Sequence, residues 1–101
     1  MAESVFDNRK EKIAAEEVVY WIDWSTRGMR TGDTVATSTW TIVTAGSGLT
    51  KDNESVNAAG TITYVRVKTG TVGGPYQLRN TVVTSDSPVE TLVEDLFITV
   101  K

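Results

Sequence analysis

Glu17-Val18-Val19-Tyr20-Trp21-Ile22-Asp23-Trp24 is the stretch that decides the fold class, because apolar side chains recur in it with a period of two. One side of the stretch carries, in order, Val18, Tyr20, Ile22 and Trp24. Such alternation is typical of a β-strand that turns one face toward a core. The other side carries Val19 and Trp21, so the second face of this predicted strand is unusually apolar.

The same alternation returns further along the chain, between residues that favour turns. It predicts strands over residues 34–43, 61–69, 76–84 and 92–100. Gly32-Asp33 and Gly73-Gly74-Pro75 supply turn signals between them. Residues 49–56 show no clear period, and we expect at most brief strands near Leu49-Thr50 and Ser55-Asn57.

Four residues are predicted to form the structural core or its framework. Trp24 and Trp40 fall on inward faces and are the largest side chains available to fill the interior. Tyr76 opens the alternation of residues 76–84, and Asn80 falls on the inward face of the same strand. Because a buried amide needs hydrogen-bond partners, we expect Asn80 to bond loop backbone and pin one end of the domain. A ligand-binding amide is the alternative.

The composition points to the same class of fold. Thr, Val and Ile make up 35 of the 101 residues, and β-branched side chains suit a pleated, half-buried surface. A chain of this length has room for one core. We therefore predict an all-β chain whose antiparallel strands, about seven in number, form a single two-layered sandwich.

The N-terminal segment differs from the rest of the chain, being rich in charge and alanine. Asn8 and Glu11 are spaced like a helix N-cap and its reciprocal partner, which predicts a turn or two of helix. We expect residues 1–15 to be an arm, disordered alone or ordered against a neighbour, and residues 16–101 to be the sandwich domain.

The sequence lacks the residues on which several classes of function usually depend. The net charge is −3 and no run of Lys or Arg could neutralise a row of phosphates, so nucleic acid is not the expected partner. Without cysteine or histidine the chain lacks disulfides, thiolate metal sites and the commonest general base. Neither a signal peptide nor a membrane-spanning run is recognisable, which predicts a protein that is made in the cytoplasm and stays soluble there. We expect no catalytic residue, no metal and no cofactor.

Carboxylates are the remaining chemical candidates. Asp52-Asn53-Glu54 is the densest cluster, but it lacks the ligand number and turn glycine of a calcium loop, so we interpret it as a turn. Asp23 and Asp33 flank a loop that their side chains are expected to close. An enzyme would need a carboxylate pair brought together by folding, which spacing alone leaves open.

The apolar second face of the first strand is the candidate interface. Val19 and Trp21 would be covered either by the N-terminal arm or by a partner subunit. Stacking of Trp21 on a sugar is a third possibility.

Three stretches together resemble a family of small phage structural proteins, the fiber–tail adaptor or minor virion proteins, whose domain is an immunoglobulin-like sandwich. The stretches are Ile22-Asp23-Trp24-Ser25, Gly32-Asp33-Thr34-Val35-Ala36-Thr37-Ser38-Thr39-Trp40-Thr41 and Tyr76-Gln77-Leu78-Arg79-Asn80-Thr81-Val82-Val83-Thr84-Ser85. They occur in the order seen in that family, over residues 18–100. The chain departs from the family pattern in its longer loop at residues 54–60 and in its charged N-terminal segment.

The resemblance implies a non-enzymatic part of a virion, made in the host cytoplasm, that joins or decorates tail, fiber or neck proteins. It implies other virion structural proteins as partners, a homo-oligomer in the assembly, and neither nucleic acid nor membrane. Capsid decoration is an alternative role. An immunoglobulin-like module that binds a host glycan or surface protein is another.

Overall fold

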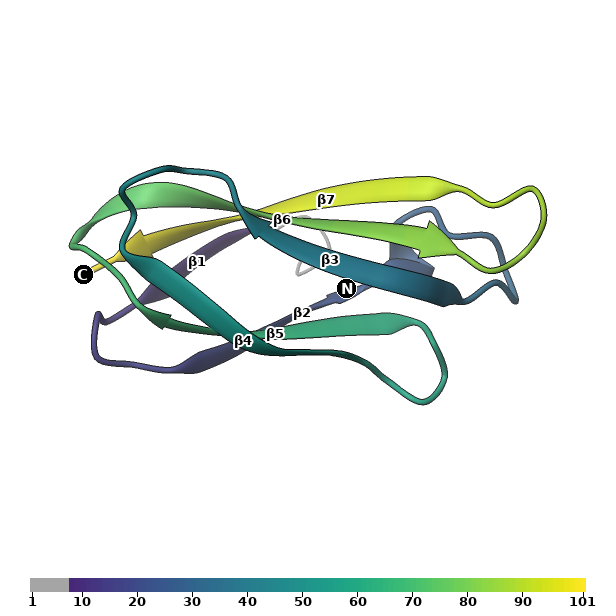
Figure 1. Ribbon diagram of the computed structural model, residues 1–101, viewed down its shortest axis with the longest axis horizontal. Helices are drawn as coiled ribbons and strands as arrows, with labels where there is room; N and C mark the ends of the chain where they lie inside the picture. The colour runs from purple at the N-terminus through teal and green to yellow at the C-terminus, as the bar shows by residue number, and fades with distance from the viewer. Residues whose placement is uncertain (1–7) are drawn as a thin grey trace.

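Seven strands make up the computed structural model, which describes residues 8–101 (Figure 1). Their bounds are β1 (Arg9–Lys12), β2 (Val18–Asp23), β3 (Val35–Ile42), β4 (Leu49–Val56), β5 (Ile62–Thr69), β6 (Gly73–Thr84) and β7 (Thr91–Val100). One short 3₁₀ turn, η1 (Trp24–Thr26), follows β2. No helix within residues 8–101 has the length and apolarity needed to span a bilayer.

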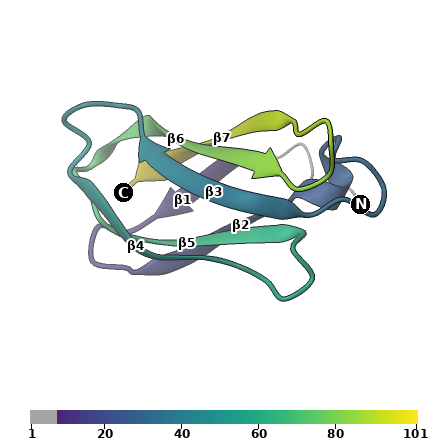
Figure 2. The same cartoon turned by 45° about the vertical axis from the view of Figure 1, so that its right-hand side comes forward.

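The strands form two sheets packed face to face, which confirms the predicted all-β sandwich (Figures 1 and 2). One sheet has the order β1-β7-β6-β3 and the other β2-β5-β4. The second to seventh strands are therefore distributed between the layers as in an immunoglobulin constant-type domain. The first strand differs, because β1 pairs parallel with β7 in the four-stranded sheet, whereas all other pairs are antiparallel.

The core lies between the inward faces of the two sheets. Trp24 and Trp40 are each at most 2% exposed. Tyr76 is partly buried, and its hydroxyl donates to the Thr71 carbonyl at 2.8 Å. This bond, from the start of the sixth strand back to the preceding loop, is the tyrosine corner of immunoglobulin-like folds. The other buried apolar residues of the core are Tyr20, Ile22, Met29, Val35, Leu49, Val65, Val67, Leu78, Val82, Leu96, Ile98 and Val100.

A buried polar network built around Asn80 joins the two sheets. The Asn80 Oδ1 accepts from Trp24 Nε1 at 3.1 Å and from the Thr63 hydroxyl at 2.6 Å. Its Nδ2 donates to Ser38 Oγ at 2.9 Å and to the Thr39 carbonyl at 3.1 Å. The expectation of loop backbone as partner was wrong, because Asn80 lies within β6, where side chains from both layers reach it first.

The predicted helix near Asn8 is also wrong. Residues 9–12 form β1, because pairing with β7 from Phe97 to Val100 gives their backbone groups partners that a short isolated helix lacks. Lys12 is 2% exposed, and its ammonium donates to the carbonyls of Ile13, Ala14 and Thr69. Burial lowers the pKa of Lys12, and the negative charges of Glu16 and Glu17, which act to raise it, are the smaller effect. Residues 1–7 of the predicted arm lie outside the described residues.

Bulges explain two further departures from the predicted strands. β4 is one strand of eight residues, and its alternation breaks where the register shifts between Asp52 and Ser55, with Asn53 in the left-handed region at φ 52°. A second shift in β3, between Val35 and Thr37, buries Val35 and leaves Ala36 exposed, although unbroken alternation with the inward Trp40 would turn Ala36 inward.

Candidate functional site

The outer face of the three-stranded sheet carries the residues predicted as an interface. Trp21 is 60% exposed and Val19 is 49% exposed, whereas Tyr20 and Ile22 between and beside them are buried. The strict alternation of β2 produces this contrast, because each residue turns to the opposite face from its neighbour. The aromatic ring of Trp21 and the branched side chain of Val19 are therefore both solvent-exposed on one side of a regular strand.

The register between β2 and β5 extends this apolar pair. Trp21 lies opposite Tyr64, and Val19 lies opposite Arg66. The Trp24 N–H donates to the Thr61 carbonyl at 2.8 Å, so Trp24 and Thr61 form a hydrogen-bonded pair. Hydrogen-bonded and non-hydrogen-bonded pairs alternate along an antiparallel ladder, which makes Trp21 and Tyr64 a non-hydrogen-bonded pair. The side chains come closest in pairs of this kind. The face thus places Trp, Tyr and Arg side by side, the three residue types that most often dominate binding energy at protein interfaces.

An ion-pair cluster borders the aromatic pair. Arg66 binds Asp52 through Nε at 2.8 Å and Nη2 at 2.9 Å. Lys68 reaches the same carboxylate at 2.9 Å, and Glu17 lies 3.3 Å from Arg66. Hydrogen bonds from Arg66 and then Lys68 hold the pKa of Asp52 far below its usual value, and the bond to Asp52 raises the pKa of Arg66. The bidentate geometry fixes the orientation of the Arg66 guanidinium relative to the Asp52 carboxylate.

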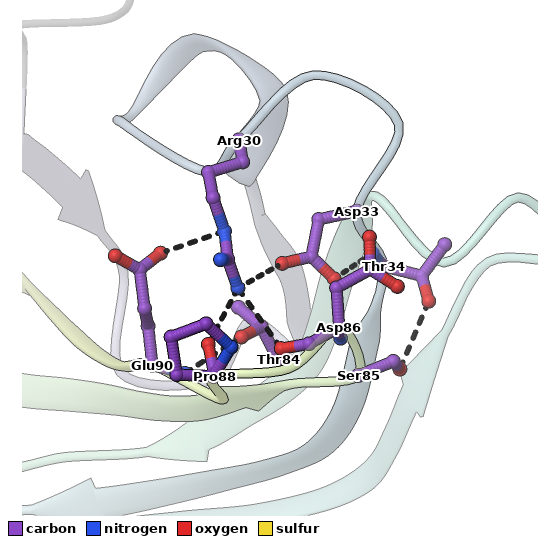
Figure 3. A network of polar contacts seen from close by, with 8 residues as sticks. All are labelled: Arg30, Asp33, Thr34, Thr84, Ser85, Asp86, Pro88 and Glu90. Carbon is purple, nitrogen blue, oxygen red and sulfur yellow. Dashed lines mark hydrogen bonds and ion pairs between the residues drawn. The ribbon is translucent and has the colours of Figure 1, made fainter.

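A second network of polar contacts lies at one end of the sandwich, where the loop before β3 meets the β6–β7 loop (Figure 3). Arg30 Nη2 donates to Asp33 Oδ2 at 3.1 Å and to the carbonyls of Asp86 and Pro88 at 2.9 and 2.7 Å. Its Nε faces Glu90 Oε1 at 3.5 Å, an ion pair rather than a hydrogen bond. One guanidinium therefore ties together two loops more than fifty residues apart.

Asp33 is the buried centre of this loop network. Burial alone would raise the pKa of Asp33, but the N–H groups of Asp86 and Thr34 and the Arg30 guanidinium outweigh it and hold that pKa below its ordinary value. Asp33 thus closes its own loop and also anchors the neighbouring one. Asp23 acts locally, accepting from the backbone and hydroxyl of Ser25 at the start of η1.

Comparison with known proteins identifies the family. Residues 12–98 match the family model described as Podophage GP4 fiber-tail adaptor protein gp77. The chain belongs to this family. The resemblance seen in the sequence is thereby confirmed, and the chain is a structural phage protein with a place in the virion. A search of the curated proteins found no match.

The family role needs no reaction chemistry, and both carboxylates of the Asp52-Asn53-Glu54 cluster in this adaptor-family chain are engaged in ion pairs. Asp52 binds Arg66 and Lys68, and Glu54 binds Lys51. Within residues 8–101 no three His, Cys, Asp or Glu side chains come together in a way that could hold a metal ion. Asp52-Asn53-Glu54, interpreted from the sequence as a turn, instead forms the bulged middle of β4.

Two residues of the exposed face escaped the sequence interpretation. Tyr64 and Arg66 lie within the predicted strand of residues 61–69 but were not predicted as interface residues. They alternate in the sequence with Thr63, Val65 and Val67, but this alternation does not say which outward residue of β5 faces which residue of β2. The interface prediction was therefore limited to Val19 and Trp21.

Proposed function

We propose that this adaptor-family chain holds a neighbouring virion protein against the outer face of its β2-β5-β4 sheet. The observation that carries the proposal is the exposed Trp21, 60% accessible and paired across the strands with Tyr64. Fully burying one large apolar side chain contributes about 1.5–3 kcal/mol, so covering this pair would supply a substantial part of a specific contact. The role is mechanical attachment, without catalysis.

The charges around this face support docking of another protein. Arg66, Lys68, Asp52 and Glu17 form ion pairs with one another and sum to zero net charge, so a partner that covers this rim needs no more than single charges. A polar rim around an aromatic centre is the usual anatomy of a protein interface. We propose tail or fiber proteins as the partners, reached after synthesis in the host cytoplasm, and several copies of the chain in the assembly.

The test is incorporation of variants into virions. Particles are assembled with Trp21→Ala in place of the natural chain, and the amount of the chain per particle is measured by quantitative mass spectrometry. We expect a clear loss of incorporation with an unchanged melting temperature of the purified domain. Val72→Ala is the matched control, because Val72 is 70% exposed but lies in the β5–β6 connection, away from this face. Normal incorporation of Trp21→Ala would contradict the proposal.

A further inference from the structure

The two sheets leave four edge strands, and three of them are protected against pairing with another chain. β1 has only four residues and reads Arg-Lys-Glu-Lys. β4 is interrupted by its bulge and carries charged side chains along its middle. On β3, the outward N–H of Trp40 is already directed at Glu54 Oε1, 3.4 Å away. Short length, charge, bulges and side-chain caps are the ordinary means by which proteins block sheet edges.

The fourth edge, β2, has none of these devices between its two ends. Its six residues pair with β5 in an unbroken register, and Val18 to Ile22 include neither a charged residue nor proline. β1, which precedes it in the chain, pairs with β7 in the opposite sheet instead of covering β2.

The backbone groups on this free edge belong to the same residues that stand exposed on the sheet face. Thr61 O accepts from Trp24 N, while Ile62 O faces β4 and accepts from Asn57 N. The alternation places Ile22 and Tyr20 in hydrogen-bonded pairs with β5 and turns the N–H and C=O of Val19 and Trp21 outward. Within residues 8–101, no backbone or side-chain hydrogen bond caps these outward groups.

We propose that β2 accepts an extended segment of a partner protein as an additional antiparallel strand of the β2-β5-β4 sheet. The outward row of this edge reads Glu17, Val19, Trp21 and Asp23. A matching strand carries apolar side chains opposite Val19 and Trp21 and a Lys or Arg at each end, opposite the two carboxylates. Main-chain bonds would supply affinity and the alternate side chains specificity.

The same row argues against a second copy of the chain as the added strand. An antiparallel pairing of two β2 strands centred on Tyr20 sets Val19 against Trp21 on the outer face, which is favourable. It also sets Glu17 of each copy against Asp23 of the other, and like charges directly opposite are destabilising. A basic-ended strand from a different protein removes that repulsion.

The inference rests on the proposed docking face and names the form that the docked segment takes. The probe is a fluorescein-labelled peptide Lys-Thr-Val-Thr-Val-Thr-Lys, titrated against the full chain and followed by anisotropy. We expect binding that weakens when both Lys are replaced by Glu. Methylation of the two Val amides should reduce affinity by about tenfold or more, because these N–H groups face β2. Methylation of the outer Thr amides, which point away, is the matched control.

The protein variants test the same backbone contact from the other side. Val19→Pro removes an outward N–H without removing a bond to β5, and proline is tolerated at such edge positions. Val19→Ala keeps the N–H and is its control. We expect Val19→Pro to abolish peptide binding and Val19→Ala to weaken it only slightly. If Val19→Pro fails to fold, the methylated peptides still decide the question.

Other results would overturn the proposal. Absence of peptide binding, or equal affinity for the Val-methylated and unmethylated peptides, would exclude strand addition. A dimer in sedimentation velocity that Val19→Pro dissolves would make a second copy the occupant. If Trp21→Ala impairs virion incorporation while Val19→Pro does not, the face docks a partner without strand addition. If neither variant impairs incorporation, the docking face itself is wrong.

Discussion

Replacing Asn80 with alanine tests whether the buried polar network holds the two sheets together. The change removes an acceptor from Trp24 Nε1 and from the Thr63 hydroxyl, and a donor from Ser38 Oγ and from the Thr39 carbonyl. Trp24 retains Thr63 Oγ1 at 3.0 Å, so the Thr63 hydroxyl is the group left without an acceptor. An orphaned buried hydroxyl costs about 1–3 kcal/mol, and the other lost bonds about 1 kcal/mol each.

These contributions add up to a loss of about 4–6 kcal/mol in the free energy of unfolding, a large part of the total stability of a small domain. In a domain of this size, that loss lowers the melting temperature by about 15 °C or more. The assay is urea unfolding followed by tryptophan fluorescence, together with thermal unfolding by circular dichroism. Thr81→Ala is the control on the next, outward-facing position of β6, with an expected change of about 0.5 kcal/mol.

Asn80→Asp separates hydrogen bonding from volume. The aspartate keeps the shape and one acceptor, but it puts a second oxygen toward the Thr39 carbonyl. Burial disfavours the charged form and raises the pKa of such a carboxyl in the folded state. A raised folded pKa means that stability is lost as the pH rises through it, so this variant should be least damaged at acidic pH. A loss below about 1 kcal/mol for Asn80→Ala would refute the role assigned to the network.

Three further outcomes are expected from the structure. Tyr76→Phe removes the bond to the Thr71 carbonyl and should lower the free energy of unfolding by about 1 kcal/mol in urea titrations, with an unchanged value counting against the tyrosine corner. Trp40→Ala should cost about 3–5 kcal/mol in the same assay, whereas Trp21→Ala should leave the monomer's stability almost unaltered, and equal losses would contradict the assigned faces. The folded state lowers the pKa of Asp33, so its carboxylate stabilises the fold above the unfolded-state pKa, near 3.8, and this stabilisation is lost as the pH falls further. Asp33→Asn should therefore make the free energy of unfolding less dependent on pH in this acidic range. An unchanged pH profile of stability in Asp33→Asn would argue against the role of the Asp33 charge.

The parts of the fold that could be predicted are those in which period-two alternation survives undisturbed. Val65 and Val67 on β5, and Leu78 and Val82 on β6, follow this alternation in the sequence, and all four are fully buried. β4 was missed because Asn53 and its neighbour interrupt the alternation at a bulge, so that one strand reads as two fragments. A local pattern cannot reveal an inserted residue whose only evidence is the register of the partner strand.

Contacts between distant segments could not be predicted either, because the local sequence pattern does not identify the partner segment. β1 is charged and short, and nothing in Arg9 to Lys12 indicates a strand until Phe97 to Val100 lie beside it. Arg30 likewise gives no sign that it will hold the loop around Asp86 and Pro88. The exposed face was predicted only in part. The sequence pattern of β2 indicated its apolar side, whereas Tyr64 becomes part of the face only because β5 pairs with β2.

The parallel pairing of the first and last strands has a mechanical consequence. β1 begins beside Phe97 and ends beside Val100, so the chain enters at one end of this ladder and leaves at the other. A tensile force applied through the two ends of the domain would pull β1 and β7 in opposite directions along their common axis. The hydrogen bonds from Phe97 N to Asn8 O and from Lys101 N to Lys12 O would then bear the load together, in shear, instead of opening one after another. We expect the domain to resist stretching between its ends better than peeling from its β3 side, a difference that single-molecule pulling from the two attachment geometries would measure.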